Sequence, residues 1–381
     1  MSGDLVFVEN SVAIAQAGAI APLVTMVQSG TDGQKEEAAG ALRNLARIYE
    51  NSVAIAEAGA IAPLVTLVQS GTDGQKEESA GALRNLARNA GNSVAITQAR
   101  AIALLVTLVQ SGTDGQKEEA AGALCMLTLD AGNRVAIAEA GAIAPLVTMV
   151  QSGTDRQKSN AAGALRNLAR IYENSVAIAE AGAIAPLVTL VQSGTDGQKE
   201  ESAGALRNLA RNAGNSVAIT QAGAIAPLVT LVQSGTDGQK EESAGALRNL
   251  ARNAGNSVAI TQAGAIAPLV TLVQSGTDGQ KEEAAGALCM LTLDAGNRVA
   301  IAEAGAIAPL VTLVQSGTDR QKSNAAGALR NLARNYETSV APSMTLVQSG
   351  TDGQTEQAVC LLCGLTIAQL WTVVQRAWSW V

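Results

Sequence analysis

The chain repeats itself with a fixed period of 41 residues. The pentapeptide Asn-Ser-Val-Ala-Ile, or a variant of it, begins at Asn10, Asn51, Asn92, Asn133, Asn174, Asn215, Asn256 and Asn297. A period of this length without insertions is typical of a solenoid, in which each unit buries its apolar face only against its neighbours. We therefore expect function on a surface that recurs along the array, and not in a single pocket.

Three helices are predicted within each unit, here taken as residues 51–91. Asn51 is predicted to cap the first helix, and Gly59 to end it in the left-handed conformation that glycine tolerates. Pro63 is then expected in the first turn of the second helix, where its missing N–H leaves no hydrogen bond unmade. The unit is therefore read as two short helices followed by a longer third helix.

The third helix has the clearest start signal, because Thr72 and Gln75 have the spacing of a capping box. It is predicted to run from about residue 73 to residue 88. One side of its helical wheel is apolar and is expected to face the core, at Ala80, Leu83, Leu86 and Ala87. The opposite stripe is expected to face solvent and carries Glu77, Glu78, Gly81, Arg84, Asn85 and Arg88.

Composition limits the kinds of function. Aromatic residues make up only 2% of the chain, so a continuous core must come from Ala, Leu, Val and Ile. The formal net charge of −7 argues against nucleic acid as a partner, which needs a basic surface. There is no histidine, which removes the commonest general base and metal ligand. We therefore predict no enzymatic activity, no metal and no cofactor.

Eight units and an incomplete ninth carry the sequence motif of a known family. Asn-Ser-Val-Ala-Ile-Ala-Glu-Ala-Gly-Ala-Ile-Ala-Pro-Leu-Val-Thr-Leu-Val-Gln-Ser-Gly, followed by Glu-Glu-Ala-Ala-Gly-Ala-Leu-Arg-Asn-Leu-Ala, resembles the armadillo repeat. The resemblance implies an all-α fold, a right-handed superhelical α-solenoid of about nine three-helix repeats. It also implies that the third helices line a concave groove that binds extended peptides. The repeat sequence most resembles plant- and protist-type proteins, including vacuolar armadillo proteins and those attached to U-box ubiquitin ligases.

The resemblance also identifies candidate partner-binding residues. In importin-α, a Trp and an Asn four residues later on the third helix hold a basic peptide. Here Gly stands at the Trp position, so basic-signal slots are not expected. An Arg precedes each retained Asn, and these pairs are the predicted partner-binding residues: Arg43, Asn44, Arg84, Asn85, Arg166, Asn167, Arg207, Asn208, Arg248, Asn249, Arg330 and Asn331.

An Arg offers a rigid fork of donors to carboxylates or phosphates, and an Asn suits a peptide backbone. The pairs therefore predict a protein partner with an extended, acidic or phosphorylated segment. The alternative is that they form only the solvated side of an amphipathic helix. Glu36 and Glu37, with their repeats, would then partly neutralise the arginines.

Exceptions to the repeat themselves recur after 164 residues, or four units. Cys125-Met126 and Cys289-Met290 replace Arg-Asn in units 3 and 7. In units 4 and 8 the segments that begin at Arg156 and Arg320 replace Gly-Gln-Lys-Glu-Glu. Duplication of a four-unit block explains this offset. Unit 3 alone has Arg100 in place of the stop glycine and Leu104 in place of the proline, so we expect a local bend there.

The array is predicted to divide into three segments. Residues 1–9 form a partial N-terminal helix, residues 10–337 form eight repeats, and residues 338–381 form a truncated ninth repeat and a Trp-containing C-terminal helix. The last segment is interpreted as a closing helix, as a decayed end or as a membrane anchor. Its Cys360-Leu-Leu-Cys363 is a lone C-x-x-C and is assigned no chemistry.

The leading functional hypothesis is a non-enzymatic scaffold that binds an extended partner segment along the concave groove. Two alternatives stay open: a substrate-recruiting module of a ubiquitin-ligase system, and a membrane-tethered scaffold held by the C-terminal tail. No secretory signal is visible at the start, and the few cysteines suit a reducing compartment, so we expect an intracellular location, cytoplasmic or nuclear. The oligomeric state is left open.

Overall fold

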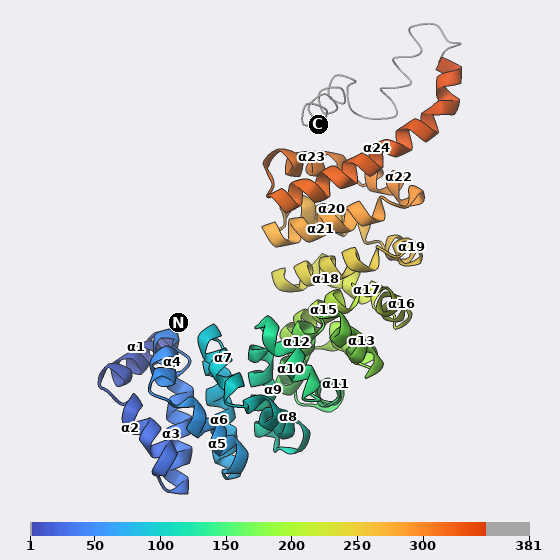
Figure 1. Ribbon diagram of the computed structural model, residues 1–381. Helices are drawn as coiled ribbons and strands as arrows, with labels where there is room; N and C mark the ends of the chain where they lie inside the picture. Colours follow the sequence, from blue (N-terminus) through green and yellow to red (C-terminus); the bar gives the residue numbers. More distant parts are fainter. Residues whose placement is uncertain (1, 348–381) are drawn as a thin grey trace.

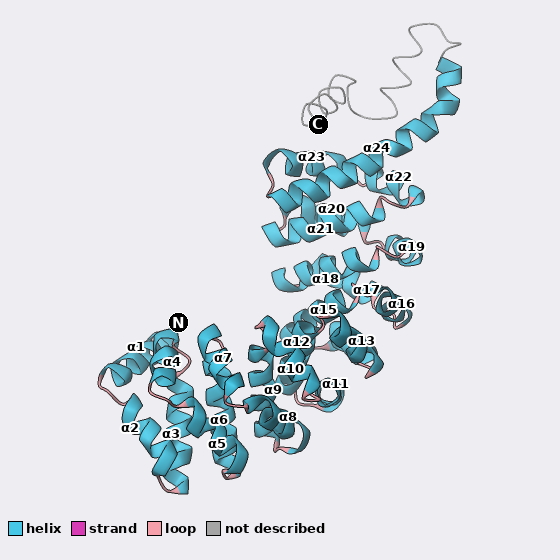
Figure 2. Cartoon of the chain, in the orientation of Figure 1, coloured by secondary structure: helices cyan, strands magenta, loops and turns pink. Residues whose placement is uncertain are grey.

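The computed structural model describes residues 2–347, which form 24 helices joined by short turns (Figure 1). The described residues contain no strand (Figure 2). Eight units of three helices follow one another along a curved array (Figure 1). The predicted all-α solenoid with a 41-residue unit is therefore confirmed.

Each unit contributes one helix to each of three series. The first helices are α1 (Ser2–Gln16), α4 (Tyr49–Glu57), α7 (Ala90–Gln98), α10 (Ala131–Glu139), α13 (Tyr172–Glu180), α16 (Ala213–Gln221), α19 (Ala254–Gln262) and α22 (Ala295–Glu303). The second helices are α2 (Ile20–Ser29), α5 (Ile61–Ser70), α8 (Ala101–Ser111), α11 (Ile143–Ser152), α14 (Ile184–Ser193), α17 (Ile225–Ser234), α20 (Ile266–Ser275) and α23 (Ile307–Ser316). The third helices are α3 (Asp32–Leu45), α6 (Asp73–Leu86), α9 (Asp114–Leu127), α12 (Asp155–Leu168), α15 (Asp196–Leu209), α18 (Asp237–Leu250), α21 (Asp278–Leu291) and α24 (Asp319–Val347).

A sharp turn separates the first and second helices of every unit. The two helices meet at 80–87°. Gly59 lies in this turn with φ +78°, a value at which an L side chain is strained, and the equivalent glycine of six other units does the same. The predicted stop at Gly59 is confirmed, and Pro63 lies in the first turn of α5 as expected.

The third helix begins with the predicted capping box. Thr72 Oγ1 accepts a hydrogen bond from Gln75 N at 3.3 Å, and Gln75 Oε1 accepts one from Thr72 N at 3.2 Å. Gln75 also reaches the preceding unit, where its Nε2 donates to Asp32 O at 2.9 Å. The helix ends at Leu86, two residues before the predicted end. One glutamine thus starts its own helix and fixes the register of the neighbouring third helix.

The core consists of aliphatic side chains, most of them from the second and third helices, with one fully buried isoleucine, such as Ile55, from the first helix of units 2–8. Leu64, Leu83 and Leu86 are fully buried, as is Ala80, which confirms the predicted apolar side of the third helix. Gly81 was expected on the exposed stripe, but it is buried. The reason is that the side chain of Arg43, from the preceding unit, lies directly over it.

The predicted cap at Asn51 is wrong. Helix α4 begins two residues earlier, at Tyr49, and Asn51 is a buried residue inside it. Its Nδ2 donates to Ser11 O of the preceding unit at 3.1 Å. In unit 3, Asn89 caps the corresponding helix and accepts from Asn92 N at 3.1 Å. The repeated asparagine therefore joins neighbouring units, because a buried amide needs a partner and the preceding helix supplies a carbonyl.

Unit 3 keeps the common geometry despite its two exceptions. Arg100 adopts φ +62°, in the left-handed region, and it is the single described non-glycine residue with positive φ. The α7 and α8 helices still meet at 84°, within the range of the other units. The expected local bend between these helices is therefore wrong. The neighbouring units impose the turn, and Arg100 carries the backbone strain.

Arg100→Gly is expected to stabilise the protein by about 1 kcal/mol, because glycine adopts this backbone conformation without a Cβ penalty. Urea unfolding followed by circular dichroism measures the change. The reverse substitution, Gly141→Arg in the equivalent turn of unit 4, should cost a similar amount. An unchanged midpoint in both variants would contradict the strain at Arg100.

The two ends differ from the regular units. Helix α1 runs without a break through residues 2–9 into the first helix of unit 1, and α24 extends beyond the usual third-helix end to Val347. Trp371, Trp378 and Trp380 of the predicted C-terminal helix lie outside the described residues. No individual helix among residues 2–347 is both long and apolar enough to cross a bilayer, although eight bent pairs reach those criteria by length and composition together.

Candidate partner-binding surface

The third helices pack side by side along the whole array, each against the third helix of the next unit. We call the surface they form the third-helix face. All twelve predicted partner-binding residues lie on these helices, near the C-terminal end except in α24, which continues past Arg330 and Asn331 to Val347. The consecutive packing places their side chains in a row along one face, as the 41-residue period predicts.

The arginines of this row make ion pairs with the following units. The Arg43 guanidinium lies 3.2 Å from Glu78 in unit 2 and also contacts Glu119 in unit 3. Arg207 repeats the pattern, with Glu242 at 3.0 Å and a contact to Glu283. The other pairs are Arg84–Glu119, Arg166–Glu201, Arg166–Glu242 and Arg248–Glu283. Arg43, Arg166 and Arg207 each contact glutamates of the two following units, and each therefore connects three successive units.

These ion pairs are largely shielded from solvent. The side chains of Glu119, Glu242 and Glu283 are only 6–8% exposed, whereas those of the arginines that pair with them are 27–32% exposed. Burial of the guanidinium lowers the pKa of Arg207, but Glu283 and Glu242 raise it more, so the pKa lies above its ordinary value. The arginine is therefore held in its charged form by buried carboxylates.

Three glutamates beside the ion-paired carboxylates, Glu77, Glu200 and Glu241, have pKa values raised above the ordinary value, which favours their neutral form. Burial, and then repulsion from Glu242, raise the pKa of Glu241, and the pKa of Glu200 is raised in the same way by burial and Glu201. Glu241 also lies against Gly279, where an added Cβ would be 2.1 Å from its Oε2. The recurring glycine in the first turn of the third helix thus leaves room for this carboxylate, near the positive end of the helix dipole.

A second recurring glycine leaves room for the arginine. A Cβ at Gly245 would lie 2.5 Å from Arg207 Nε and 2.8 Å from its Cδ. The same overlap occurs at Gly81, Gly122, Gly204 and Gly286. This is the position at which the importin-type repeat has a tryptophan. Any side chain here would displace the arginine of the preceding unit.

The asparagines of the row also contact the preceding unit. The Nδ2 atoms of Asn85, Asn208 and Asn249 each donate, at 2.8 Å, to the backbone carbonyl of the arginine in this row one unit earlier. After a cysteine unit the partner is a threonine hydroxyl, so that Asn167 donates to Thr128 Oγ1 and Asn331 to Thr292 Oγ1, each at 3.2 Å. Asn44 is exposed, since no third helix precedes α3 in the described chain.

The exceptions in units 3 and 4 remove both partners of one ion pair together. An arginine at position 125 would pair with residue 160, thirty-five positions later, as Arg43 pairs with Glu78. Position 125 is Cys and position 160 is Asn, so the cation and its carboxylate are both absent. Asn160 Nδ2 donates instead to Glu118 O at 3.0 Å. Cys289 and Asn324 repeat this combination in units 7 and 8.

The described cysteines give no sign of reactivity or metal binding. Burial raises the pKa of the Cys125 thiol to about 12, and the pKa of Cys289 is raised by the same cause. Among residues 2–347, no group of three or more His, Cys, Asp or Glu side chains is arranged to hold a metal ion. Cys360 and Cys363 lie outside the described residues.

A second row of arginines lies four residues beyond the first, and the sequence reasoning did not assign it to binding. It comprises Arg47, Arg88, Arg170, Arg211, Arg252 and Arg334, with Leu129 and Leu293 in the two cysteine units. Arg88, Arg211 and Arg252 are exposed, and no carboxylate of the described chain lies within 4.0 Å of their guanidinium groups. Arg47 lies over the Phe7 ring at 4.5 Å. The recurrence of Arg just after each helix end was the available signal.

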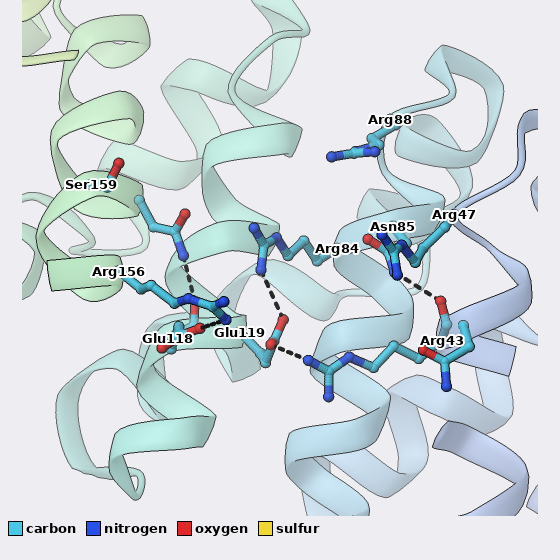
Figure 3. Close-up of a pocket in the computed structure, with 11 residues that line it drawn as sticks. Arg43, Arg47, Arg84, Asn85, Arg88, Glu118, Glu119, Arg156 and Ser159 are labelled. Carbon is cyan, nitrogen blue, oxygen red and sulfur yellow. Dashed lines mark hydrogen bonds and ion pairs between the residues drawn. The ribbon is translucent and has the colours of Figure 1, made fainter. Parts of the chain in front are cut away.

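Both rows line a cavity of about 580 Å³ on the third-helix face of units 1–4. Figure 3 shows Arg43 and Arg84 directed at Glu119, whereas Arg88 stands apart from these ion pairs. The lining residues are Arg43, Asn44, Arg47, Arg84, Asn85, Arg88, Glu118, Glu119, Arg156, Ser159 and Asn160. Five arginines against two glutamates leave an excess of positive charge in a chain whose net charge is −7.

The structure thus assigns different surroundings to the two rows. The predicted partner-binding arginines, except the exposed Arg330, are half-buried and paired within the described chain. Their role in partner binding stays a prediction. In the second row, Arg88, Arg211 and Arg252 offer guanidinium groups without a carboxylate partner in the described chain.

Comparison with known proteins gives one family match. The armadillo/beta-catenin-like repeat model matches residues 7–47, 49–88, 130–170, 172–211, 212–252, 253–292 and 294–334. Residues 89–129, which contain Arg100 and Leu104, fall between matched stretches. No curated protein matches the chain.

Solved structures agree with this match. An engineered protein is 31% identical, with a TM-score of 0.77 over 91% of this chain and 88% of that chain. A designed armadillo repeat protein is 27% identical, with a TM-score of 0.56 over 61% of this chain and 99% of that chain. Computationally designed armadillo repeat proteins for modular peptide recognition share the fold at 24% identity, with a TM-score of 0.56 over 60% of this chain and 99% of that chain.

Proposed function

Because the chain belongs to the armadillo/beta-catenin-like repeat family, we propose that it is a protein-binding scaffold whose third-helix face holds an extended, acidic or phosphorylated partner segment. The excess of arginine in the cavity of units 1–4 carries this proposal. An extended segment fits a face built of similar units, because each unit offers the same kinds of contact in turn.

The two arginine rows have different parts in this proposal. Arg88, Arg211 and Arg252 have no carboxylate partner in the described chain, so their donors are available to a ligand. In the first row, the ion pairs between units join neighbouring third helices and leave fewer guanidinium donors for a ligand. Partner carboxylates or phosphates are therefore expected to contact the second row first, since its guanidinium groups are exposed.

The test uses a fluorescent peptide of about twelve residues, alternating Ser and Glu, and measures its anisotropy on titration with the full chain. The double variant Arg211→Glu, Arg252→Glu should weaken binding at least tenfold. The loss is expected because each substitution removes a guanidinium group that would bind a peptide carboxylate. Each lost charged contact costs about 1 kcal/mol or more of binding free energy.

Lys199→Glu is the matched control. It reverses one charge at a different cavity, between α14 and α17, and should leave the peptide affinity nearly unchanged. Equal affinity of the double variant and the parent protein would overturn the proposed binding face. Circular dichroism of all variants shows whether the array is intact.

The alternative functions gain no support from the described residues. A role in recruiting substrates to a ubiquitin ligase was suggested by the resemblance to plant- and protist-type repeats. The solved structures that match include engineered and designed proteins, which do not bear on that role. A membrane-tethered scaffold depends on the C-terminal tail, beyond the described residues. Both stay proposals, as does the intracellular location, and neither alternative has an observation that favours it over peptide binding.

A further inference from the structure

The residues that line the cavity of units 1–4 recur in units 5–8. Each of the eleven lining residues is matched by the same residue type 164 positions later. We call the first set the N-terminal site. The second set, the C-terminal site, consists of Arg207, Asn208, Arg211, Arg248, Asn249, Arg252, Glu282, Glu283, Arg320, Ser323 and Asn324.

The contacts of the two sites recur as well as the residues. Arg84 lies 3.2 Å from Glu119 in the first site, and Arg248 lies 3.2 Å from Glu283 in the second. The exposed pair Arg156–Glu118, at 3.2 Å, recurs as Arg320–Glu282 at 3.4 Å. The amides agree too, because Asn160 donates to Glu118 O at 3.0 Å and Asn324 to Glu282 O at 2.9 Å. The two sites therefore share these ion pairs and amide contacts, and they differ at Asn44 and Arg47, where Asn208 donates to Arg166 O and Arg47 lies over the Phe7 ring.

Each site has more positive than negative charge. Five arginines face two lining glutamates in either set, and both glutamates are already held by arginine. Arg43 also pairs with Glu78, and Arg207 with Glu242, so three glutamates offset five arginines at each site. Arg88 in the first site and Arg252 in the second have no carboxylate partner in the described chain. A phosphate group carries about −1.5 to −2 charge and accepts bidentate hydrogen bonds from guanidinium groups. One or two phosphate groups would thus balance the charge of one site.

The basic surface of each site is interrupted in one unit. In unit 3 the two arginine rows are replaced by Cys125 and Leu129, and Leu129 is 53% exposed. Unit 7 repeats this with Cys289 and Leu293, whereas Arg166 and Arg170 of unit 4 continue the rows to the C-terminal site. In each site, one unit without either arginine therefore separates four arginines from the exposed Arg156 or Arg320. A ligand with evenly spread acidic residues would place part of its charge against this stretch, where no guanidinium group of unit 3 meets it.

We propose that the chain binds a single protein segment that carries two phosphorylated clusters, one in each site. This inference rests on the proposed function, and it adds that the spacing of the clusters determines the affinity. Four helix-to-helix steps of roughly 9 Å each separate the sites by about 36 Å. An extended segment covers this distance with about 11 residues, at roughly 3.3 Å per residue.

The test uses fluorescent peptides of Gly, Ser and Ala that contain one phosphoserine, or two phosphoserines separated by about 4, 8, 11 or 14 residues. Anisotropy with the full chain gives each affinity. The best-spaced doubly phosphorylated peptide should bind at least tenfold more tightly than the singly phosphorylated one, because the second contact is intramolecular. The spacing of about 4 residues should give little gain. Glu in place of both phosphoserines separates phosphate from carboxylate recognition and should lower the affinity.

Arg88→Ala and Arg252→Ala provide matched variants, one in each site. Each should reduce the affinity of the best doubly phosphorylated peptide to that of the singly phosphorylated one. Lys199→Ala, at the separate cavity, should have no effect.

Three results would overturn the inference. If no spacing gives a gain, while Arg88→Ala and Arg252→Ala together still weaken the singly phosphorylated peptide, the sites act separately and the proposed function stands. If neither variant changes any affinity, both the inference and the proposed function fail. If an oligodeoxythymidine of similar length displaces the best peptide at physiological salt, the face is a polyanion surface without the proposed selectivity.

Discussion

Arg207→Glu is expected to destabilise the central units by about 2–4 kcal/mol, since removing one partner of a buried ion pair leaves uncompensated charge. Arg207 contacts Glu242 and Glu283, whose side chains are 8% and 6% exposed. The variant places a third carboxylate beside these two. Urea unfolding followed by circular dichroism measures the global loss, and amide hydrogen exchange locates it in α15, α18 and α21.

The chain supplies its own controls for this result. Arg211→Glu reverses a charge on the same face at an exposed site without a carboxylate partner, and its midpoint should shift little. Arg207→Cys with Glu242→Asn copies the natural combination of Cys125 and Asn160. A double-mutant cycle should show that the two changes together cost less than their sum by at least about 0.5 kcal/mol. Additive costs, or a stable Arg207→Glu protein, would show that the buried ion pairs do not support the array.

Gly245→Ala is expected to destabilise the protein by about 1–3 kcal/mol, as overpacking of a filled site does. Alanine in an exposed helix interior normally gains about 1 kcal/mol over glycine. Here its Cβ would lie 2.5 Å from Arg207 Nε, so the arginine must move and its ion pairs with Glu242 and Glu283 must open. The unfolding midpoint in urea measures the sign of the change.

Gly40→Ala is the matched control at the equivalent position of unit 1. No arginine from a preceding unit lies over Gly40 in the described chain. An added Cβ at Gly40 would come closest to the flexible Glu78 carboxylate, at 3.2 Å. This variant should be neutral or stabilising. A gain of stability in both variants would mean that the arginine moves without loss, and that the recurring glycine has no steric role.

Local signals in the sequence were enough for the fold. The Thr72–Gln75 capping box, the turn at Gly59 and the aliphatic stripe at Leu83 each act within one unit, and the structure confirms them. Asn51 and Gly81 were misassigned because their roles depend on the preceding unit. A helical wheel reports which side of one helix is apolar, but not which neighbouring side chain crosses it.

The candidate surface was predictable in part. Its helices and its row of Arg-Asn pairs follow from the period. The partners of those residues follow from the spacing between third helices, which brings Arg43 to Glu78 and Glu119 across 35 and 76 residues. No pattern within a single unit contains these distances. The second row, with Arg88 and Arg252, was visible as a repeat but could not be separated from paired arginines until burial was known.

Arg43, Arg166 and Arg207 each contact the two following units, and this reach has a consequence for cooperativity. Solenoid stability is usually written as a sum of terms between nearest neighbours. Arg207 adds a direct tie between units 5 and 7, so unfolding of one unit weakens the two that follow. At Cys125 this tie is missing, and the exposed pair Arg156–Glu118, with the arginine 81% exposed, replaces it weakly. We therefore expect the array to open first at the joint between units 3 and 4 and at its repeat between units 7 and 8, where Cys289 and Asn324 recur and the arginine of the pair Arg320–Glu282 is 82% exposed.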